Sequence, residues 1–492
     1  MKRILLSVLL SFVCILSFAQ GWTADWYTGL HLAAASEKFL PFWARTGHDG
    51  ILPVSTGGTA IVGADLKSQA SNGIYLATGF NLAGSMVPND PLGGKKFTGL
   101  VDRLYVSAGW RMLGIDVGLK PRERELGDLS LTGGDIMYTR NARNMLGINM
   151  KADWIYFEKG HWFGFRGNLA HYTLSDTRYT KAPMIHNKSL AFKIALGRKV
   201  DFIVGLDHWA HWGGEDPQVG KQPSGFKDFL KIFLAQKGGD GATASDRLNV
   251  LGNHLGRELI RIDWRASNFT MNFQYDKPFE DGSGVRYQNF PDGVWTLQFV
   301  RKDRDAFVTD ILFELATTTW QSGEAHDRPA TEEEMKDQNP ESPYYGKIVI
   351  GGCDNYFNNG MYRSGWTHYG RVIGLPLFVP YAPDSDGVTK GIVSNRLMAY
   401  HLALKGVFGK KVPYVFKATY SNQYGIYHQA KTSFFNTYPW QVNLAFELDF
   451  GKRLFGNVPL SFALGVYGDV GKLYDNSLGL TLRMTYREHR RF

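Results

Sequence analysis

The stretch SLGLTLRMTYREHRRF (477–492) closes the chain and alternates apolar with polar residues. Leu478, Leu480, Leu482, Met484 and Tyr486 fall on even positions, and the odd positions between them are small or polar. Successive side chains of a β-strand point to opposite faces, so this period of two predicts a strand with one apolar side and one wet side.

The same alternation recurs upstream. Residues 440–450 place Trp440, Val442 and Leu444 on one face and polar residues on the other, and residues 260–265 repeat the pattern. A soluble sandwich would bury its apolar faces and wet its polar faces, so alternation alone leaves the class open. Apolar faces on segment after segment, often with aromatics near their ends, favour a barrel with lipid outside and a wet lumen.

Connection lengths provide a second, independent signal. Short turns are predicted near 69–72, 110–112, 159–161, 197–199, 268, 303–305, 409–410 and 451–456. Longer connections are predicted near 36–56, 84–99, 122–149, 174–186, 211–257, 278–293, 320–394, 423–438 and 470–476. Tight periplasmic turns that alternate with longer external loops are typical of transmembrane barrels. With an opening strand near 23–35, we expect an all-β fold: an antiparallel transmembrane β-barrel of about 18 strands, occluded by long external loops with one or more short helices.

The N-terminus reads as a secretory signal peptide over residues 1–19. Lys2 and Arg3 precede an apolar run that ends before Ser17 and Ala19, which fit the small-residue cleavage rule. The run is shorter than the roughly 20 residues of a spanning helix. Cys14 suggests a lipoprotein as an alternative, but Val13 stands where a small residue is expected. We therefore expect residues 20–492 to form a single barrel domain in the outer membrane of a Gram-negative cell, with its long loops at the cell surface.

Phe492 has the same parity as the apolar face of the last strand. A terminal aromatic on an amphipathic strand looks like the signal that barrel-assembly machinery recognises during biogenesis. Outer-membrane lipid and that machinery are thus two expected partners.

Cleavage would leave Cys353 as the single cysteine, which can form no internal disulfide. The net charge of +9 fits an acidic glycan or lipid head groups; we expect no nucleic-acid partner, no cofactor and a monomer.

The 211–257 connection contains a helical pattern. Phe226, Phe229, Leu230, Phe233 and Leu234 recur at helical spacing and form one apolar stripe. Ser224 is the expected N-cap and Gly238 the expected stop. Such a helix needs an apolar partner, so we expect it to pack against the barrel or to fold into its mouth; packing alone is favoured over ligand binding.

The 320–394 connection contains CDNYFNNGMYRSGWTHYGRVIG (353–374), which is dense in Tyr, Trp, Asn, Arg and Gly. Aromatic faces stack on sugar C–H faces, and Asn and Arg side chains satisfy hydroxyls and carboxylates. The alternative is a self-packed plug built from the same residues. The candidate glycan-binding residues are Tyr356, Asn358, Asn359, Tyr362, Arg363, Trp366, Tyr369 and Arg371, joined by Trp209 and Trp212 from another loop.

The histidines of DHWAHWGGEDP (207–217) suggest a metal site. On a strand, however, His208 and His211 differ by an odd number and point to opposite faces. No third ligand has suitable spacing, so we expect no metal site. An interfacial aromatic belt explains Trp209 and Trp212 as an alternative.

Four loop segments together resemble the capsule-assembly proteins of the Wzi family. They are HWAHWGGEDPQVGKQPSGFKDFLKIFLAQKGG (208–239), LGNHLG (251–256), PFEDGSGVRYQNFPDGVW (278–295) and NYFNNGMYRSGWTHYGRVIGLPLF (355–378). The resemblance implies an 18-stranded outer-membrane barrel occluded by loops and helical elements. It also implies a surface lectin that attaches exported capsular polysaccharide to the outer membrane. No clear helical bundle occurs near the N-terminus, which departs from the proteobacterial members.

Three functions remain open at this point. The first is a non-enzymatic lectin that retains capsular or other surface polysaccharide. The second is a substrate-specific channel or porin, lined by inward polar residues such as Arg261, Lys405, Glu447 and Arg483. The third is an outer-membrane hydrolase, which would need a nucleophile or carboxylates beside a histidine. The histidines at 171, 208, 401 and 428 show no such partner by spacing, and we expect no enzyme.

Overall fold

The computed structural model describes residues 21–492 except 90, 92–93, 158–159, 237–249, 324–327, 330, 334–347, 350–351, 428–436, 452–455 and 457–458. The expected signal peptide, Gly238 and His428 lie outside the described residues.

Within the described residues, 18 strands join into one antiparallel sheet. The first nine are β1 (Trp22–Ala35), β2 (Gly57–Gln69), β3 (Ile74–Met86), β4 (Phe97–Trp110), β5 (Leu113–Leu119), β6 (Leu146–Tyr156), β7 (Phe163–Thr173), β8 (Met184–Leu196) and β9 (Val200–Trp212). The other nine are β12 (Asn253–Arg265), β13 (Phe269–Phe279), β14 (Gly293–Arg301), β15 (Asp310–Thr317), β22 (Leu397–Phe408), β23 (Val412–Gln423), β24 (Trp440–Phe450), β25 (Leu460–Gly471) and β26 (Ser477–Arg491).

The sheet closes on itself where the last strand meets the first. β26 pairs antiparallel with β1, from Thr23 opposite Arg491 to Ala35 opposite Gly479. The amide of Phe492 donates to the carbonyl of Trp22 at 2.8 Å, so both ends of the described chain lie at one end of the barrel. Closure gives every strand two neighbours, which a strand in hydrocarbon requires because no water is present to satisfy an open edge. The predicted fold class is confirmed, including the strand count.

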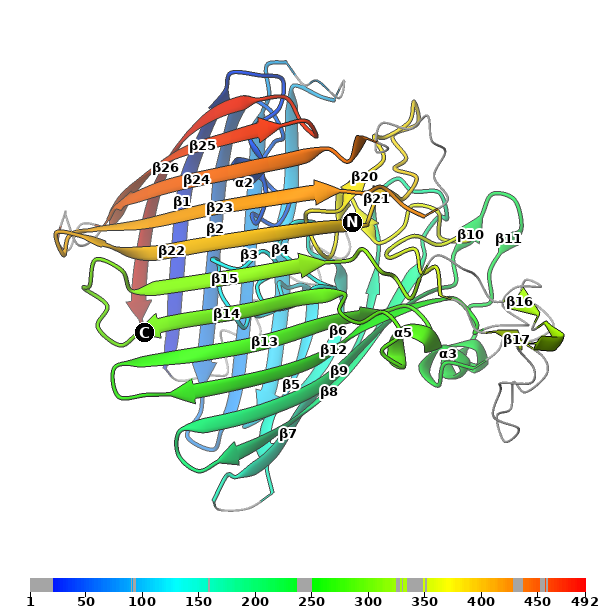
Figure 1. Cartoon of the computed structure of the whole chain (residues 1–492). Helices are drawn as coiled ribbons and strands as arrows, with labels where there is room; N and C mark the ends of the chain where they lie inside the picture. The colour runs from blue at the N-terminus through cyan, green and yellow to red at the C-terminus, as the bar shows by residue number, and fades with distance from the viewer. Residues whose placement is uncertain are drawn as a thin grey trace.

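The two ends of the barrel differ in their connections (Figure 1). All eight predicted short turns join strands at one end, which we call the turn end, and it also carries Trp22 and Phe492. The strand ends that flank the nine predicted longer connections lie at the other end, the loop end. Small two-stranded sheets occur among these connections: β10 (Glu215–Asp216) with β11 (Gly220–Lys221), β16 (Arg328–Pro329) with β17 (Ile348–Val349), β18 (Thr367–His368) with β19 (Arg371–Val372), and β20 (Val379–Pro380) with β21 (Ile392–Ser394).

The outer wall is apolar and the inner wall is polar, as the alternation predicts. On β26, Leu478 and Leu480 are exposed while Ser477, Gly479 and Thr481 face inward and are buried. On β24, Gln441, Asn443 and Ala445 are likewise buried inside while Leu444 is exposed outside. Exposed aromatics near the short turns include Trp110, Phe157, Trp162 and Phe307. An exposed apolar band flanked by aromatics is the surface that a bilayer-spanning barrel presents to lipid.

In the described parts of the loop-end connections lie three short helices: α2 (Phe42–Arg45), α3 (Phe226–Phe233) and α5 (Gly282–Val285). No helix among the described residues combines the length and the hydropathy needed to cross a membrane. The expected helix near 226 is confirmed as α3, and it packs against the barrel. Its N-cap is Gly225 rather than Ser224, because the Asp228 carboxylate reaches back to the Gly225 amide at 2.9 Å and satisfies the first turn.

Candidate functional site: the plugged mouth

Three loop-end connections fold into the barrel and fill its mouth. We call residues 36–56, 120–145 and 353–378 the plug. Its segments are hydrogen-bonded to each other: the Trp366 indole donates to the Met137 carbonyl at 2.6 Å, and the Thr139 amide donates to the Ile373 carbonyl at 2.8 Å. The Arg371 guanidinium donates to the carbonyls of Arg45 and Leu52. The plug is therefore one packed unit assembled from three distant stretches of sequence.

Carboxylates on the inner wall hold the plug by its backbone amides. Asp276 on β13 accepts from Ile136, Glu314 on β15 accepts from Leu131, and Asp469 on β25 accepts from Phe42, at 2.7–2.9 Å. The wall also donates: Nε2 of Gln274 reaches the Gly134 carbonyl at 3.0 Å. A typical buried hydrogen bond contributes about 1 kcal/mol, and bonds to charged groups roughly twice that. These contacts make the plug a fixed element.

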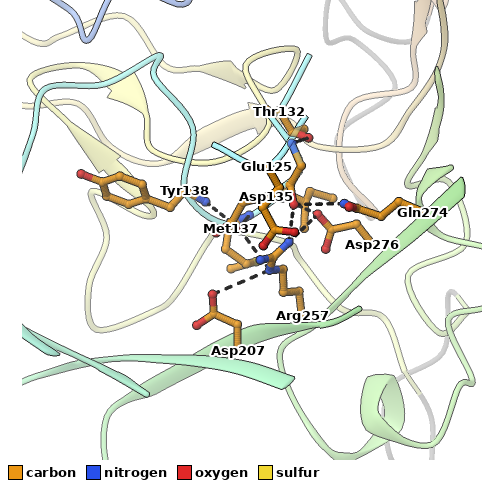
Figure 2. A network of polar contacts seen from close by, with 12 residues as sticks. Glu125, Thr132, Asp135, Met137, Tyr138, Asp207, Arg257, Gln274 and Asp276 are labelled. Carbon is orange, nitrogen blue, oxygen red and sulfur yellow. Dashed lines mark hydrogen bonds and ion pairs between the residues drawn. The ribbon is translucent and has the colours of Figure 1, made fainter. Parts of the chain in front are cut away.

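Arg257 on β12 anchors the centre of the plug (Figure 2). Its guanidinium lies 3.1 Å from Asp276, 3.4 Å from Asp135 and 3.7 Å from Asp207. Asp135 belongs to the plug, so this network joins the plug to strands β9, β12 and β13. Burial raises the pKa of Asp135, and the Arg257 charge opposes that rise.

Aromatic stacking fills the space around Trp366, which is fully buried. Its ring centroid lies 5.4 Å from that of Trp209 and 5.0 Å from that of His211. Trp209 in turn stacks on Tyr138 and carries the Arg122 guanidinium 4.9 Å from its ring. Trp209 thus points into the lumen, so an interfacial aromatic belt does not describe it. The alternating faces predicted for His208 and His211 are confirmed, since His208 contacts His254 outside the lumen.

The start of the 353–378 segment is bound by a group of loop carboxylates. Asp354 accepts from the Ser322 hydroxyl at 2.8 Å, and Asp292 accepts from the Tyr356 hydroxyl at 3.2 Å. Glu280 accepts from the Phe357 amide. Burial raises the pKa of Asp354 to about 7 and that of Asp292 to about 6, so both bind protons more readily than free aspartates. Serine and tyrosine hydroxyls favour their charged forms and limit the rise.

The ten predicted glycan-binding residues all lie within the described part of the chain, and they divide into three groups. Five aromatics are buried in the fold: Trp209, Trp212, Tyr356, Tyr362 and Trp366. Three are partly buried with their polar groups occupied by protein: Asn358, Asn359 and Arg371. Arg363 and Tyr369 are exposed. The plug interpretation accounts for the first two groups except Trp212, which lies outside the lumen beneath α3.

Arg363 and Tyr369 each pair with a residue from another loop. The Arg363 guanidinium lies 4.9 Å from the Tyr179 ring, and the Arg143 guanidinium lies 4.0 Å from the Tyr369 ring. Segments 174–180 and 361–369 run beside each other, joined by bonds such as that from the Thr180 hydroxyl to the Met361 carbonyl. We call these four residues the Arg–Tyr strip. Sequence reasoning missed Arg143 and Tyr179, because no local pattern links them to the 353–374 segment.

Asp176 and Ser175 support the Tyr369 end of the strip. The Asp176 carboxylate accepts from the Tyr369 amide at 2.9 Å, and Ser175 lies 3.3 Å from the Tyr369 hydroxyl. Tyr369 nevertheless stays 42% exposed. An exposed ring next to a cation offers both a stacking face and a charge to a ligand.

Cavities remain beneath the plug in the described part of the barrel, and charged side chains line two of them. One of about 500 Å³ includes Arg261 and Arg166; the other, of about 740 Å³, includes Lys405, Glu447 and Arg483. The four residues expected to line a channel thus all face the lumen. Among the hydrolase candidates, His401 lies inside the barrel and bonds the Thr419 hydroxyl and the Leu129 carbonyl at 2.8 Å each.

Comparisons with known proteins agree with this architecture. No family model and no curated protein matches the sequence. Among solved structures, the chain is similar to Wzi, an outer-membrane protein involved in group 1 capsule assembly in Escherichia coli and a carbohydrate-binding β-barrel. The TM-score is 0.54 at 11% identity, over 97% of this chain and 87% of that one.

Matches to two further structures are weaker. OccAB4 of Acinetobacter baumannii gives a TM-score of 0.45 at 8% identity, over 95% of this chain and 98% of that one. OprD of Pseudomonas aeruginosa gives 0.45 at 8% identity, over 95% and 94%. With its closed sheet and apolar outer wall, this chain has the fold of an outer-membrane β-barrel.

Proposed function

We propose that this chain is a non-enzymatic surface lectin of the outer membrane, which binds exported capsular polysaccharide or another exopolysaccharide and retains it at the cell. The observation that carries the proposal is the Arg–Tyr strip, held at the loop end on a fixed plug. The likeness to a carbohydrate-binding barrel supports it. The proposal places the loop end at the cell surface and the turn end in the periplasm, as in barrels whose short turns are periplasmic.

The chemistry of the strip suits an acidic glycan. The exposed ring of Tyr369 can stack on the C–H face of a sugar, and the Arg143 and Arg363 guanidiniums can offer charge to carboxylates or hydroxyls. Arg363 is already held by hydrogen bonds to the Gly360 carbonyl and the Gln218 side chain at 3.0 Å each, which orient its guanidinium. One such contact is weak. A polymer with many repeats meets the site again after each dissociation, and neighbouring copies of the protein engage the same strand, so retention exceeds the affinity of any single site.

A substrate-specific channel is the second candidate, and the two charged cavities favour it. Conduction would require the plug to leave its carboxylate anchors on β13, β15 and β25. Each anchor is a charge-assisted hydrogen bond, so the cost of release is several kcal/mol on the scale of roughly 1.5–3 kcal/mol per bond. The fixed plug therefore favours a binding surface over a pore.

The test removes the strip and leaves the plug. In the Tyr369→Ala, Arg363→Ala double variant, binding of detergent-folded protein to purified surface polysaccharide should weaken about tenfold, since a stacking contact and a cation contact of about 0.5–1 kcal/mol each are lost. Tyr381→Ala is the matched control, because Tyr381 is equally exposed but lies outside the strip. Binding that is unchanged in the double variant, or reduced as much in the control, would contradict the site.

A further inference from the structure

Polar side chains gather on the outer wall beneath α3. Near the loop end of β7, β8, β9 and β12 the outward residues include His171, His186, Lys188, His208 and His254, beside the apolar Met184, Ala210 and Trp212. Polar side chains on the lipid face of a barrel are destabilising, more so with depth. This patch therefore needs a cover.

Helix α3 provides that cover. The Phe229 ring lies 5.3 Å from His186 and 5.7 Å from Trp212, and Lys188 donates to the Phe233 carbonyl. Ile232 is fully buried in a cluster with Ala210, Trp212 and Leu251. One face of α3 thus packs against the barrel wall.

A second apolar line on the helix points away from the barrel. Phe226, Leu230 and Leu234 are 75%, 43% and 58% exposed, and their spacing of four places them along one side. The predicted stripe of five residues is therefore split: Phe229 and Phe233 contact the wall, and the other three do not. Lys227 and Lys231 lie off the exposed line. Soluble proteins rarely leave such a line in water.

The exposed line of α3 begins where the lipid-facing wall ends. Leu190 and Leu206 are paired across β8 and β9 and are both exposed, two residues closer to the turn end than Lys188 and His208. Two residues of strand span roughly 7 Å. The helix therefore lies directly above the apolar band, and its apolar side chains continue the surface that lipid already covers.

The α5 segment repeats this arrangement over β12, β13 and β14 (Figure 1). On the wall, Lys277 forms an ion pair with Glu258 at 3.4 Å, and the Tyr287 ring covers it at 4.2 Å from the ammonium group. Tyr287 and Phe290 are themselves exposed, and Phe290 packs edge-on against Trp295. A second polar pair on the wall is thus covered by a segment that turns aromatics outward.

We propose that α3 and the α5 segment lie in the outer leaflet of the bilayer, as an apron around one side of the barrel. The exposed side chains of Phe226, Leu230 and Leu234 insert among the upper acyl chains, and Lys227 and Lys231 meet the head-group phosphates. Amphipathic helices with lysines beside an apolar face bind membrane interfaces in this way. The apron shields the polar wall patch from hydrocarbon and fixes the depth and tilt of the barrel. The inference depends on membrane insertion and is independent of what the mouth binds.

Depth-resolved fluorescence quenching tests this placement. The full chain, with Cys14 and Cys353 changed to Ser, receives a single cysteine by Leu230→Cys and a thiol-reactive fluorophore. It is reconstituted in bilayers of phosphatidylcholine and phosphatidylglycerol with a nitroxide either near the glycerol or at mid-chain. Since interfacial helices sit roughly 5–10 Å into the head-group boundary, the shallow nitroxide should quench the label about twofold more than the deep one.

Two matched positions calibrate the measurement. Leu206→Cys reports the lipid-facing wall, and Ser385→Cys reports an exposed loop-end residue. If the Leu230 label resembles the Ser385 label and responds to an aqueous quencher, the helix lies in water and the proposal is wrong. If neither quencher reaches it, a second copy or another protein covers the face, which also overturns the proposal. A Leu206 label without lipid quenching in the folded protein would show that the wall below α3 does not contact lipid, which overturns the proposal together with the membrane placement of the barrel.

Discussion

Replacing Trp366 by Ala should loosen the plug without opening the barrel. Trp366 is fully buried among Trp209 and His211, and its indole bonds the Met137 carbonyl. The substitution therefore removes a large ring from a closed cluster and leaves a buried carbonyl without its donor. No strand of the barrel contains position 366, so the sheet keeps its hydrogen bonds.

The expected cost follows from these contacts. Truncating a buried Trp to Ala costs about 3–5 kcal/mol, and that range includes the cavity left behind. An effect of this size raises the population of the undocked plug by roughly a hundredfold to a few thousandfold, at about 1.4 kcal/mol per tenfold change. Amide hydrogen exchange reports such local opening, because protected amides exchange only from the open state.

The assay is hydrogen exchange of the folded protein in detergent, read by mass spectrometry on peptides from 353–378 and from the strands. Exchange in 353–378 and in 136–141 should accelerate by about two to three powers of ten, while the strand peptides stay protected. Trp110→Ala, an exposed tryptophan at the turn end, is the control and should leave the plug unchanged. Equal protection of the plug in wild type and in Trp366→Ala would refute the packing argument, and loss of strand protection would refute the independence of plug and wall.

Three further outcomes are expected. Arg257→Gln removes the cation that Asp135, Asp207 and Asp276 share, of which, among the described residues, only Asp207 keeps a second ion-pair partner, Arg122 at 3.6 Å, and it should cost about 3–5 kcal/mol in urea unfolding, against less than about 1 kcal/mol for the half-exposed Arg265→Gln on the same strand. Burial raises the pKa of Asp354 from 3.8 to about 7, so between these values the folded state binds a proton that the unfolded state does not. Protection of residues 353–357 from hydrogen exchange should therefore fall as the pH rises from about 4 to about 7, and Asp354→Asn should abolish this dependence on pH. Unmodified protein in planar bilayers should carry no large steady current, and such a current would favour the channel.

The strands could be predicted from the sequence because their signals are local. The period of two from Leu478 to Tyr486 indicates a strand with one polar and one apolar side. A short turn such as 409–411 indicates that the two strands it joins pair with each other. Both features arise within about a dozen residues of the chain. The full set of short and long connections was therefore recoverable, with boundaries within a few residues.

The site could be predicted only in part, because its contacts are distant in sequence. The residue types in 353–374 predict either a glycan-binding site or a self-packed plug, because both use the same aromatic and amide side chains. Trp366 is buried and Tyr369 exposed, three positions apart, and both meet residues of the distant 120–145 segment: Trp366 bonds Met137, while Tyr369 contacts Arg143. Helical spacing likewise identified α3 but not which part of its apolar stripe the wall would cover.

The way the plug is anchored bears on what the mouth can do. Asp276, Glu314 and Asp469 stand on β13, β15 and β25, so they grip the plug from separate positions on the wall. A plug that opens as a gate must be free of the wall on one side so that it can rotate about the other. Hydrogen bonds to three separate strands oppose such a rotation. A surface that retains a polymer has the opposite requirement, because a binding site that is already ordered loses less entropy when it binds. If a polymer is held at Tyr369 as proposed, force on it passes through the plug to these carboxylates and into the hydrogen-bonded wall.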